Sequence, residues 1–263
     1  MSGAPIDIDG FARALAQAEA TRVAIAPLTE TEPSLGVPEA YAIQAANIER
    51  RVGAGARILG RKVGLTSAAM QQALGVSEPD YGALLDDMFL EEGDPLQLGT
   101  LVAARVEGEI AFVLEHDLAG PGATAAAAAR ACAGALPALE IIDSRITDWK
   151  ITLADTVADN ASSARVLLGA TITPLDRFDP RLVGLVIERN GELAATGAGA
   201  AVLGNPLRCV AWLANALAGH GDSLKAGDVV LAGALHAALP LGPGDVVRAE
   251  LAHLGAVTLS VAA

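Results

Sequence analysis

The chain has 263 residues, of which 52% are hydrophobic but only 3% aromatic, so one substantial core must be built from alanine, valine, leucine and isoleucine. A formal net charge of −13 argues against nucleic acid and anionic membranes as partners, because both select basic surfaces. Two cysteines, Cys132 and Cys209, are too few for a disulfide framework. No basic, apolar leader opens the sequence, and we expect a reducing, cytoplasmic setting.

Two amphipathic helices are predicted before residue 57. Residues 7–26 carry apolar side chains at helical spacing, and residues 38–52 open with Pro38, a residue favoured in the first turn of a helix. A loop rich in Thr, Glu and Pro separates them. We therefore assign residues 1–57 to a small helical N-terminal lobe and residues 58–263 to the main domain.

From Ile58 onward, short strand-like runs alternate with Gly, Asp and Pro. Strands are predicted over residues 58–64, 105–114, 137–143, 182–188, 192–196, 228–231, 246–251 and 256–261. Short helices are predicted over residues 66–74, 123–135 and 207–218, which places both cysteines in helical segments. Many short strands with few helices argue against a doubly wound sheet and favour an α+β body with a mixed sheet.

Three acidic residues stand inside apolar strand-like runs. Glu107 and Glu109 are two apart, so on a strand both point to one face, and Glu140 lies in a run typical of a buried strand. Buried carboxylates are costly without positive charge, and three that converge would bind a hard divalent cation such as Mg²⁺ or Mn²⁺ in preference to zinc. The same pattern also fits a solvated outer face, with Glu140 paired to a buried arginine.

Two further residues are candidates for proton transfer or for structural roles. Lys62 lies between glycines in a strand, where a lowered pKa would make it a proton carrier, or where its amine reaches solvent at a sheet edge. Asp80 follows Pro79 in a predicted loop, which either holds a carboxylate rigidly or makes an ordinary turn. Residues 148–163 are dense in short polar groups, as in a substrate-lining loop or a surface loop.

Five segments, taken in order, resemble one known family. They are Lys62–Ser67 (KVGLTS), Pro79–Gly82 (PDYG), Val106–Ala111 (VEGEIA), Ala138–Arg145 (ALEIIDSR) and Asp155–Ser162 (DTVADNAS). Together they resemble the 2-keto-4-pentenoate (2-hydroxypenta-2,4-dienoate) hydratases of the fumarylacetoacetate hydrolase superfamily. The resemblance runs from about Tyr41 to the C-terminus.

This resemblance implies a mixed β-roll of the fumarylacetoacetate hydrolase C-terminal type as the catalytic domain. It implies that three carboxylates hold Mg²⁺ or Mn²⁺, that two residues move protons, and that three more contact the substrate. The metal-binding carboxylates would be those of Glu107, Glu109 and Glu140. The residues that move protons would be Lys62 and Asp80, and those that contact the substrate would be Thr66, Asp159 and Ser162. It further implies a homo-oligomer, pentameric or decameric, associated with neighbouring pathway enzymes.

The activity implied is hydration of 2-hydroxypenta-2,4-dienoate to 4-hydroxy-2-oxopentanoate in aromatic meta-cleavage catabolism. One segment resembles the hydratases more than the related 4-oxalocrotonate decarboxylases, namely Asp159-Asn160-Ala161-Ser162-Ser163. The decarboxylases remain the alternative. The hydrolase branch uses a His-Glu pair on an N-terminal lid, whereas the first histidine here is His116. A non-catalytic scaffold is a third possibility, against which the intact set of acidic residues argues.

Overall fold

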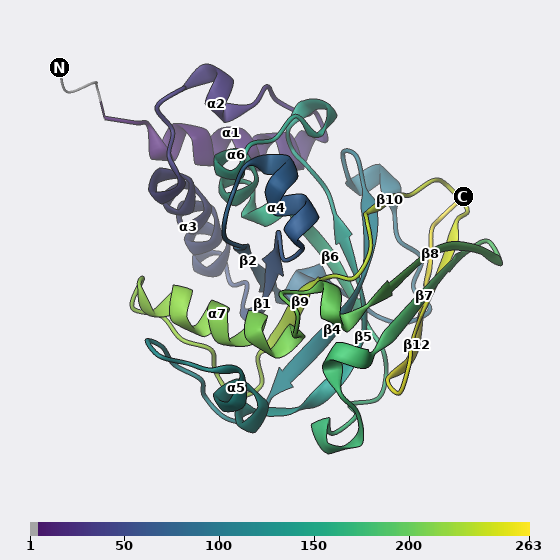
Figure 1. Ribbon diagram of the computed structural model, residues 1–263. Coiled ribbons are helices and arrows are strands. Elements are labelled where there is room, and N and C mark those ends of the chain that lie inside the picture. Colours follow the sequence, from purple (N-terminus) through teal and green to yellow (C-terminus); the bar gives the residue numbers. More distant parts are fainter. Residues whose placement is uncertain (1–4) are drawn as a thin grey trace.

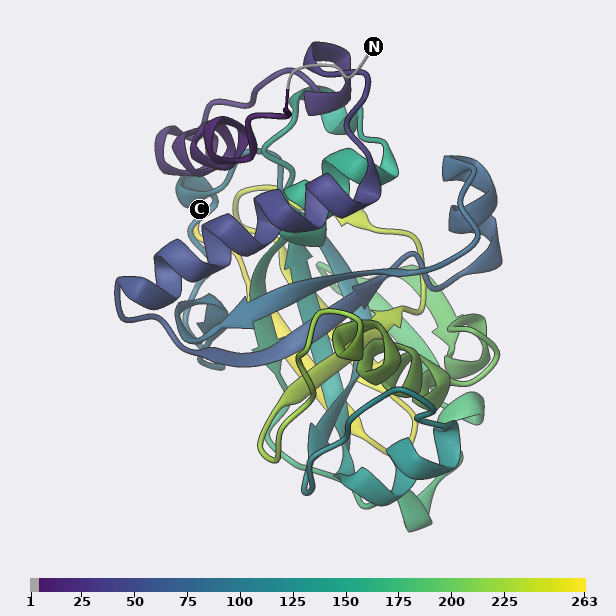
Figure 2. The same ribbon diagram turned by 90° about the vertical axis from the view of Figure 1, so that its left-hand side faces the viewer.

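Two β-sheets form the body of the protein in the computed structural model, which describes residues 5–263. In Figures 1 and 2, the helices α3, α5 and α7 lie on one side of this body, and strands β7, β8 and β12 lie toward the other. The helices are α1 (Ile8–Thr21), α2 (Leu28–Thr31), α3 (Val37–Gly53), α4 (Ala68–Leu74), α5 (Ala125–Ala131), α6 (Leu153–Ala158) and α7 (Pro206–Ala218). The strands are β1 (Ile58–Gly64), β2 (Asp80–Leu85), β3 (Phe89–Leu90), β4 (Arg105–Leu114), β5 (Cys132–Ile142), β6 (Ser163–Leu168), β7 (Gly184–Arg189), β8 (Glu192–Ala198), β9 (Val229–Ala234), β10 (Leu239–Pro240), β11 (Val246–Leu251) and β12 (Gly255–Ser260).

The larger sheet has the order β2-β1-β9-β4-β5-β6-β3, with the short strand β10 paired to β4. Its neighbours are antiparallel except for the parallel pairs β1–β9 and β3–β6, so the sheet is mixed as the sequence predicts. The smaller sheet, β12-β11-β7-β8, is antiparallel throughout, and its strands β11 and β12 contact β5. The main hydrophobic core includes side chains from both sheets.

Strand β4 divides its side chains between this core and the opposite face of the sheet. Its even-numbered members, including Ile110 and Phe112, are fully buried in the core, and a Cβ added to Gly108 would meet Leu185 and Ile187 of β7. Because strand side chains alternate, the odd-numbered residues from position 105 to 113 face the other way. That second face begins with the charged residues 105, 107 and 109 and ends with apolar ones, so its first end is suited to bind a charged ligand.

The N-terminal helices have a separate small core. Ala12 and Leu15 of α1 and Ile43 of α3 pack with Ile146 and Val157, which belong to the segment around α6. Helix α1 is capped by the side chain of Asp7, and α3 has Pro38 in its first turn, which explains where each begins. The division at residue 57 stays a prediction, although the helical lobe shares its core with α6.

The structure corrects four local predictions. The helix predicted over residues 123–135 ends at Ala131, because Cys132 begins β5 and pairs with Leu114 of β4. Long-range strand pairing therefore overrides the helix propensity of alanine, and Cys132 lies in a strand. Asp80 was expected in a loop but begins β2. Helix α1 ends at residue 21 and not at 26, and the predicted loop before α3 contains the short helix α2. Among the described residues, no helix is long and apolar enough to cross a membrane.

Candidate active site

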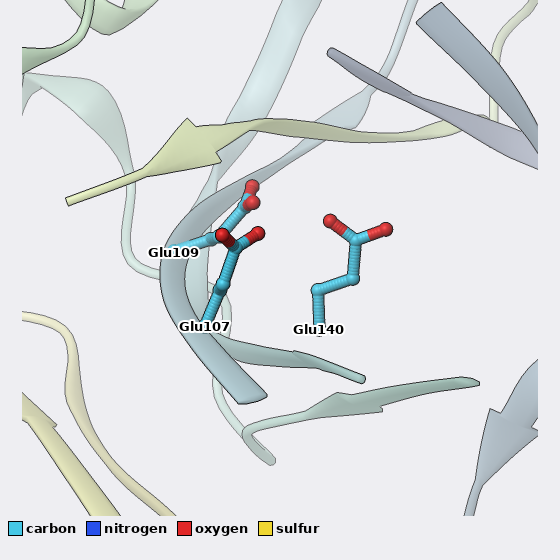
Figure 3. Close-up of side chains that lie close together, drawn as sticks. All are labelled: Glu107, Glu109 and Glu140. Atoms are coloured by element: carbon cyan, nitrogen blue, oxygen red, sulfur yellow. The ribbon is translucent and has the colours of Figure 1, made fainter. Parts of the chain in front are cut away.

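Three glutamates meet where β4 and β5 pair. Glu107 lies directly opposite Glu140 in the antiparallel register, and Glu109 is one strand repeat further along β4. Figure 3 shows the carboxylates of the three converging from the two strands on one space. One oxygen from each lies within 4.8 Å of the others. Like charges directly opposite on a sheet are destabilising, so this arrangement needs a compensating positive charge.

The environment of Glu107 and Glu109 opposes their ionisation. Burial, with the charges of Glu140 and Glu107 added, raises the pKa of Glu109 well above its ordinary value. Burial also raises the pKa of Glu107 to about 7, against the opposing effect of Lys62. Glu140 is 0% exposed, and neither of its carboxylate oxygens has a hydrogen-bond partner among the described residues.

These residues fit a divalent cation. A fully buried carboxylate without hydrogen bonds is costly unless a positive charge compensates it, and three converging carboxylates offer only oxygen ligands. The backbone N–H of Gly233 donates to Oε2 of Glu109 at 2.8 Å, which fixes that carboxylate and leaves its other oxygen free of this bond. Ligand carboxylates oriented by a second hydrogen bond are typical of metal sites.

Lys62 is the cation nearest this cluster among the described residues. Its Nζ lies 3.4 Å from Oε2 of Glu140 and donates a hydrogen bond of 2.8 Å to the carbonyl of Ala161. Burial lowers the pKa of Lys62, but the charges of Glu140 and Asp80 outweigh burial and raise it above the ordinary value. The side chain is only 5% exposed and does not reach solvent at a sheet edge, which removes that interpretation. In the chain alone Lys62 therefore holds its proton.

Asp80 lies beside Lys62 on the neighbouring strand. Its Oδ1 is buried and has no hydrogen-bond partner within residues 5–263, and burial raises its pKa against the opposing effect of Lys62. Asp80 pairs with Gly64 across β1 and β2, and a Cβ added to Gly64 would come under 3.0 Å from Oδ1 of Asp80. The space above Gly64 is therefore occupied by the Asp80 carboxyl group, so this position requires glycine.

A strained turn carries the carbonyl that binds Lys62. Asn160, Ala161 and Ser162 are three consecutive residues with positive φ between 50° and 57°, a conformation that residues other than glycine seldom adopt. The side chain of Asn160 pairs with both the N–H and the carbonyl of Ala83, at 2.8 and 2.9 Å. Such strain persists only where the surroundings fix the backbone, and it is frequent at functional sites.

Asp159 lies on the far side of this turn. Its carboxylate accepts hydrogen bonds from the backbone and side chain of Arg145 in a buried ion pair, and Arg145 also donates to the Asp159 carbonyl at 2.6 Å. Burial raises the pKa of Asp159 to about 6 despite this partner. Asp159 borders a small cavity of about 100 Å³ beside α1 and α3, apart from the glutamates. Its predicted contact with substrate stays a prediction, and its observed contacts anchor the turn.

A larger cavity of about 580 Å³ opens in front of the glutamates. Lys62, Asp80, Glu107 and Glu109 border it together with the predicted substrate residues Thr66 and Ser162. Ser162 and Thr156 place their hydroxyls 3.3 Å apart there. Thr66 packs over Gly233, where any Cβ would come under 3.0 Å from its Oγ1. The structure thus brings seven of the eight predicted site residues together and leaves Asp159 behind them.

Sequence reasoning missed several residues that border the same cavity. Arg105 precedes Glu107 on the same face of β4, and its guanidinium lies 4.4 Å from the ring centroid of Trp149. His236 accepts a hydrogen bond of 2.8 Å from the N–H of Gly108, the residue between the two strand glutamates. The strand alternation that indicated Glu107 and Glu109 also includes Arg105, so that signal was present. No local pattern indicated that His236 would accept a hydrogen bond from Gly108, because the two residues are far apart in the sequence.

Comparison with known proteins places this site in a family. The model of the fumarylacetoacetate (FAA) hydrolase C-terminal domain matches residues 58–262. The chain belongs to the fumarylacetoacetate hydrolase family. This membership confirms the predicted mixed β-roll, and residues 58–262 are the part of the chain that carries it.

Relatives within the fumarylacetoacetate hydrolase family are similar over nearly their whole length. The TodF product hydratase of Pseudomonas putida is 47% identical over 246 residues, which cover 93% of this chain and 92% of the relative. The 2-keto-4-pentenoate hydratase of Paraburkholderia xenovorans is 46% identical, with 94% and 91% covered. The 4-oxalocrotonate decarboxylase of P. putida G7, solved with magnesium and adipate, has a TM-score of 0.94 and 36% identity, with 97% of each chain covered.

Proposed function

We propose that the protein is a hydro-lyase that adds water to 2-hydroxypenta-2,4-dienoate to give 4-hydroxy-2-oxopentanoate. The observation that carries the proposal is the cavity itself, which Glu107, Glu109 and the Lys62–Asp80 pair line, with Glu140 completing the carboxylate cluster. A short 2-hydroxy or 2-oxo acid has two oxygens that chelate a cation and a carbon chain that accepts protons. The hydratase names of relatives at 46–47% identity support the same reaction.

Glu107, Glu109 and Glu140 are the residues that would hold the divalent ion, and we propose Mg²⁺ or Mn²⁺. All-oxygen ligation with open positions suits both ions, and the decarboxylase of P. putida G7 was solved with magnesium. When bound, such an ion supplies Lewis acidity that stabilises negative charge on the substrate's oxygens. No organic cofactor is needed for this reaction.

The remaining residues would move protons and orient the substrate and the attacking water. Conversion of the dienol to the 2-oxo-3-enoate takes a proton from the 2-hydroxyl group and places one on C5. Hydration then adds a hydroxyl group at C4 and a proton at C3. Lys62 holds a proton at the wall of the cavity, and burial raises the pKa of Asp80, so the two side chains are the candidates for proton exchange with the substrate. Ser162 would orient the substrate or the attacking water.

A 4-oxalocrotonate decarboxylase is the second candidate, because the fold of that enzyme matches this chain with a TM-score of 0.94. Loss of CO₂ from 2-oxohex-3-enedioate also leaves negative charge on the substrate's oxygens, which the same divalent ion would stabilise. The hydratase relatives are more similar in sequence, at 46–47% against 36% identity, and this difference favours hydration.

One substrate panel separates the two candidates. Purified protein with Mg²⁺ or Mn²⁺ is given 2-hydroxypenta-2,4-dienoate and, separately, 2-oxohex-3-enedioate. We expect loss of the dienol absorbance in the first case and no release of CO₂ in the second. Release of CO₂ without consumption of the dienol would replace the proposed reaction by decarboxylation.

We further propose a cytoplasmic homo-oligomer, pentameric or decameric. Both cysteines are buried and free, as expected for a reducing compartment. Strand β8 lies at the edge of its sheet, and the apolar side chains of Leu182 and Leu193 beside it are 75% and 69% exposed. An exposed sheet edge is able to pair with another chain, and exposed apolar side chains beside it are suited to an interface. Light scattering coupled to gel filtration measures the assembly directly, and a monomeric mass would refute it.

A further inference from the structure

Arg105 brings a positive charge to the cavity, and within residues 5–263 its guanidinium has neither a hydrogen-bond acceptor nor an ion-pair partner. It borders the cavity on the same face of β4 as Glu107 and Glu109. Among residues 5–263, no carboxylate or carbonyl oxygen accepts a hydrogen bond from its guanidinium, and it forms no ion pair. In a chain of net charge −13, an inward-facing arginine without an acceptor has donors available for a ligand.

Trp149 holds this guanidinium in place. The ring lies 4.4 Å from the guanidinium carbon, and the indole N–H donates to the carbonyl of Ala103 at 3.1 Å. Asp148 and Trp149 both have φ of 57°, so the backbone adopts a left-handed turn to present the ring there. A ring that covers the face of a guanidinium leaves its edge of N–H donors free, and that edge matches the two oxygens of a carboxylate.

The site keeps a net negative charge even with a divalent ion bound, so one more positive charge would stabilise a bound carboxylate. The three glutamates and Asp80, when ionised, exceed Lys62 by three negative charges, and a divalent ion leaves one in excess. A substrate carboxylate would add another in a cavity that is partly shielded from water. Arg105 is the remaining cation that borders the cavity, so it offsets the charge that the substrate brings.

We propose that Arg105, oriented by Trp149, binds the C1 carboxylate of the substrate. This inference rests on the proposed hydratase function and assigns the orientation of the substrate within it. Two residues of a strand span about 7 Å, so Arg105 lies beside Glu107 at one end of the cluster. Lys62 lies on β1, two strands away from β4 in the sheet, and Asp80 lies on β2 beyond it. The carboxylate end of the substrate would therefore face Arg105, and the reacting C4 and C5 would face Asp80 on β2, while Lys62 reaches the cluster itself with Nζ 3.4 Å from Glu140.

Binding of two unreactive probes to the Mg²⁺-loaded protein tests this assignment. The probes are 2-oxopentanoate, which has only the C1 carboxylate, and 2-oxohexanedioate, which adds a distal one. Calorimetry on Arg105→Met is expected to show about a 10- to 100-fold loss of affinity for both probes, the usual loss for a hydrogen bond to a charged group. Arg105→Lys is expected to recover part of the loss, since it restores the charge without the fork of donors. Trp149→Leu is expected to weaken both probes and leave Mg²⁺ affinity within about twofold.

Arg248→Met is the matched control, because Arg248 lies on the smaller sheet and pairs with Glu250 at 2.7 Å. It removes one positive charge away from the cavity and is expected to bind both probes like the parent protein. A loss confined to 2-oxohexanedioate would overturn the proposal and place Arg105 at the distal end. Unchanged affinity for both probes would also overturn it. In either case, dienol hydration by the parent protein would leave the proposed function standing, so the two failures are distinguishable.

Discussion

Replacing Gly64 with alanine is expected to inactivate the enzyme by displacing Asp80. The added Cβ would lie under 3.0 Å from Oδ1 of Asp80 and 3.5 Å from Nζ of Lys62. Asp80 is only 2% exposed and starts a strand whose residues are all buried, so its carboxyl group has little room to retreat. Overpacking of this kind costs about 1–3 kcal/mol of stability, and misplacing an acid–base group lowers kcat by about 10²–10⁴.

The control and the double variant make this prediction specific. Gly184→Ala also adds a methyl group to a strand glycine, but in the described part of the chain no atom beyond its sequence neighbours lies within 4 Å of the new Cβ, so activity and melting temperature are expected to stay near the parent values. In an Asp80→Ala background, the further change Gly64→Ala is expected to cost little, because the clashing carboxyl group is gone. The assays are dienol consumption under saturating Mg²⁺ and thermal unfolding. A Gly64→Ala enzyme with parental kcat would refute the role given to this contact.

Three further predictions concern the carboxylate cluster and its neighbours. Lys62→Met is expected to keep Mg²⁺ binding but lower kcat by about 10²–10⁴, and a near-parental rate measured by the dienol assay would make Lys62 structural. Because the pKa of Glu107 is raised to about 7, protons compete with the metal below that pH, so calorimetric Mg²⁺ affinity is expected to rise from pH 6 to pH 8. In the metal-free protein the same raised pKa of Glu107 means that the free energy of unfolding falls as pH rises from about 4.5 to about 7. The gain in melting temperature on adding Mg²⁺ is therefore expected to be larger at pH 8 than at pH 6. An equal gain at the two pH values would contradict this expectation. His236→Phe removes the acceptor of the Gly108 N–H and is expected to weaken Mg²⁺ binding by about 10- to 100-fold, whereas His236→Gln, which keeps an acceptor, is expected to lose less.

Strand alternation, a local rule, was sufficient to predict part of the cluster. Glu107 and Glu109 share a face by their spacing, and Glu140 lies in an apolar run that must be buried. Their direct opposition, by contrast, depends on the register of β4 against β5, which no local pattern specifies. The order of motifs shared with the hydratase family supplied that missing information.

Other features were beyond prediction because they depend on distant contacts. The alanine-rich segment before residue 135 has high helix propensity, yet pairing with β4 draws Cys132 into a strand. The anchoring of Asp159 by Arg145 links residues 14 apart through a buried turn, so a residue expected in the cavity lies behind it. The strain at Asn160, Ala161 and Ser162 is equally invisible in the sequence, since none of the three is glycine.

Incorporation of solvent oxygen tests the central claim most directly. The reaction is run in ¹⁸O-labelled water with Mg²⁺ and 2-hydroxypenta-2,4-dienoate, and the product is examined by ¹³C NMR for the isotope shift at each carbon. We expect a stable label at C4 with the parent protein and none with the Glu107→Gln/Glu140→Gln double variant. A product without label at C4, or equal labelling by the double variant, would contradict hydration at this site.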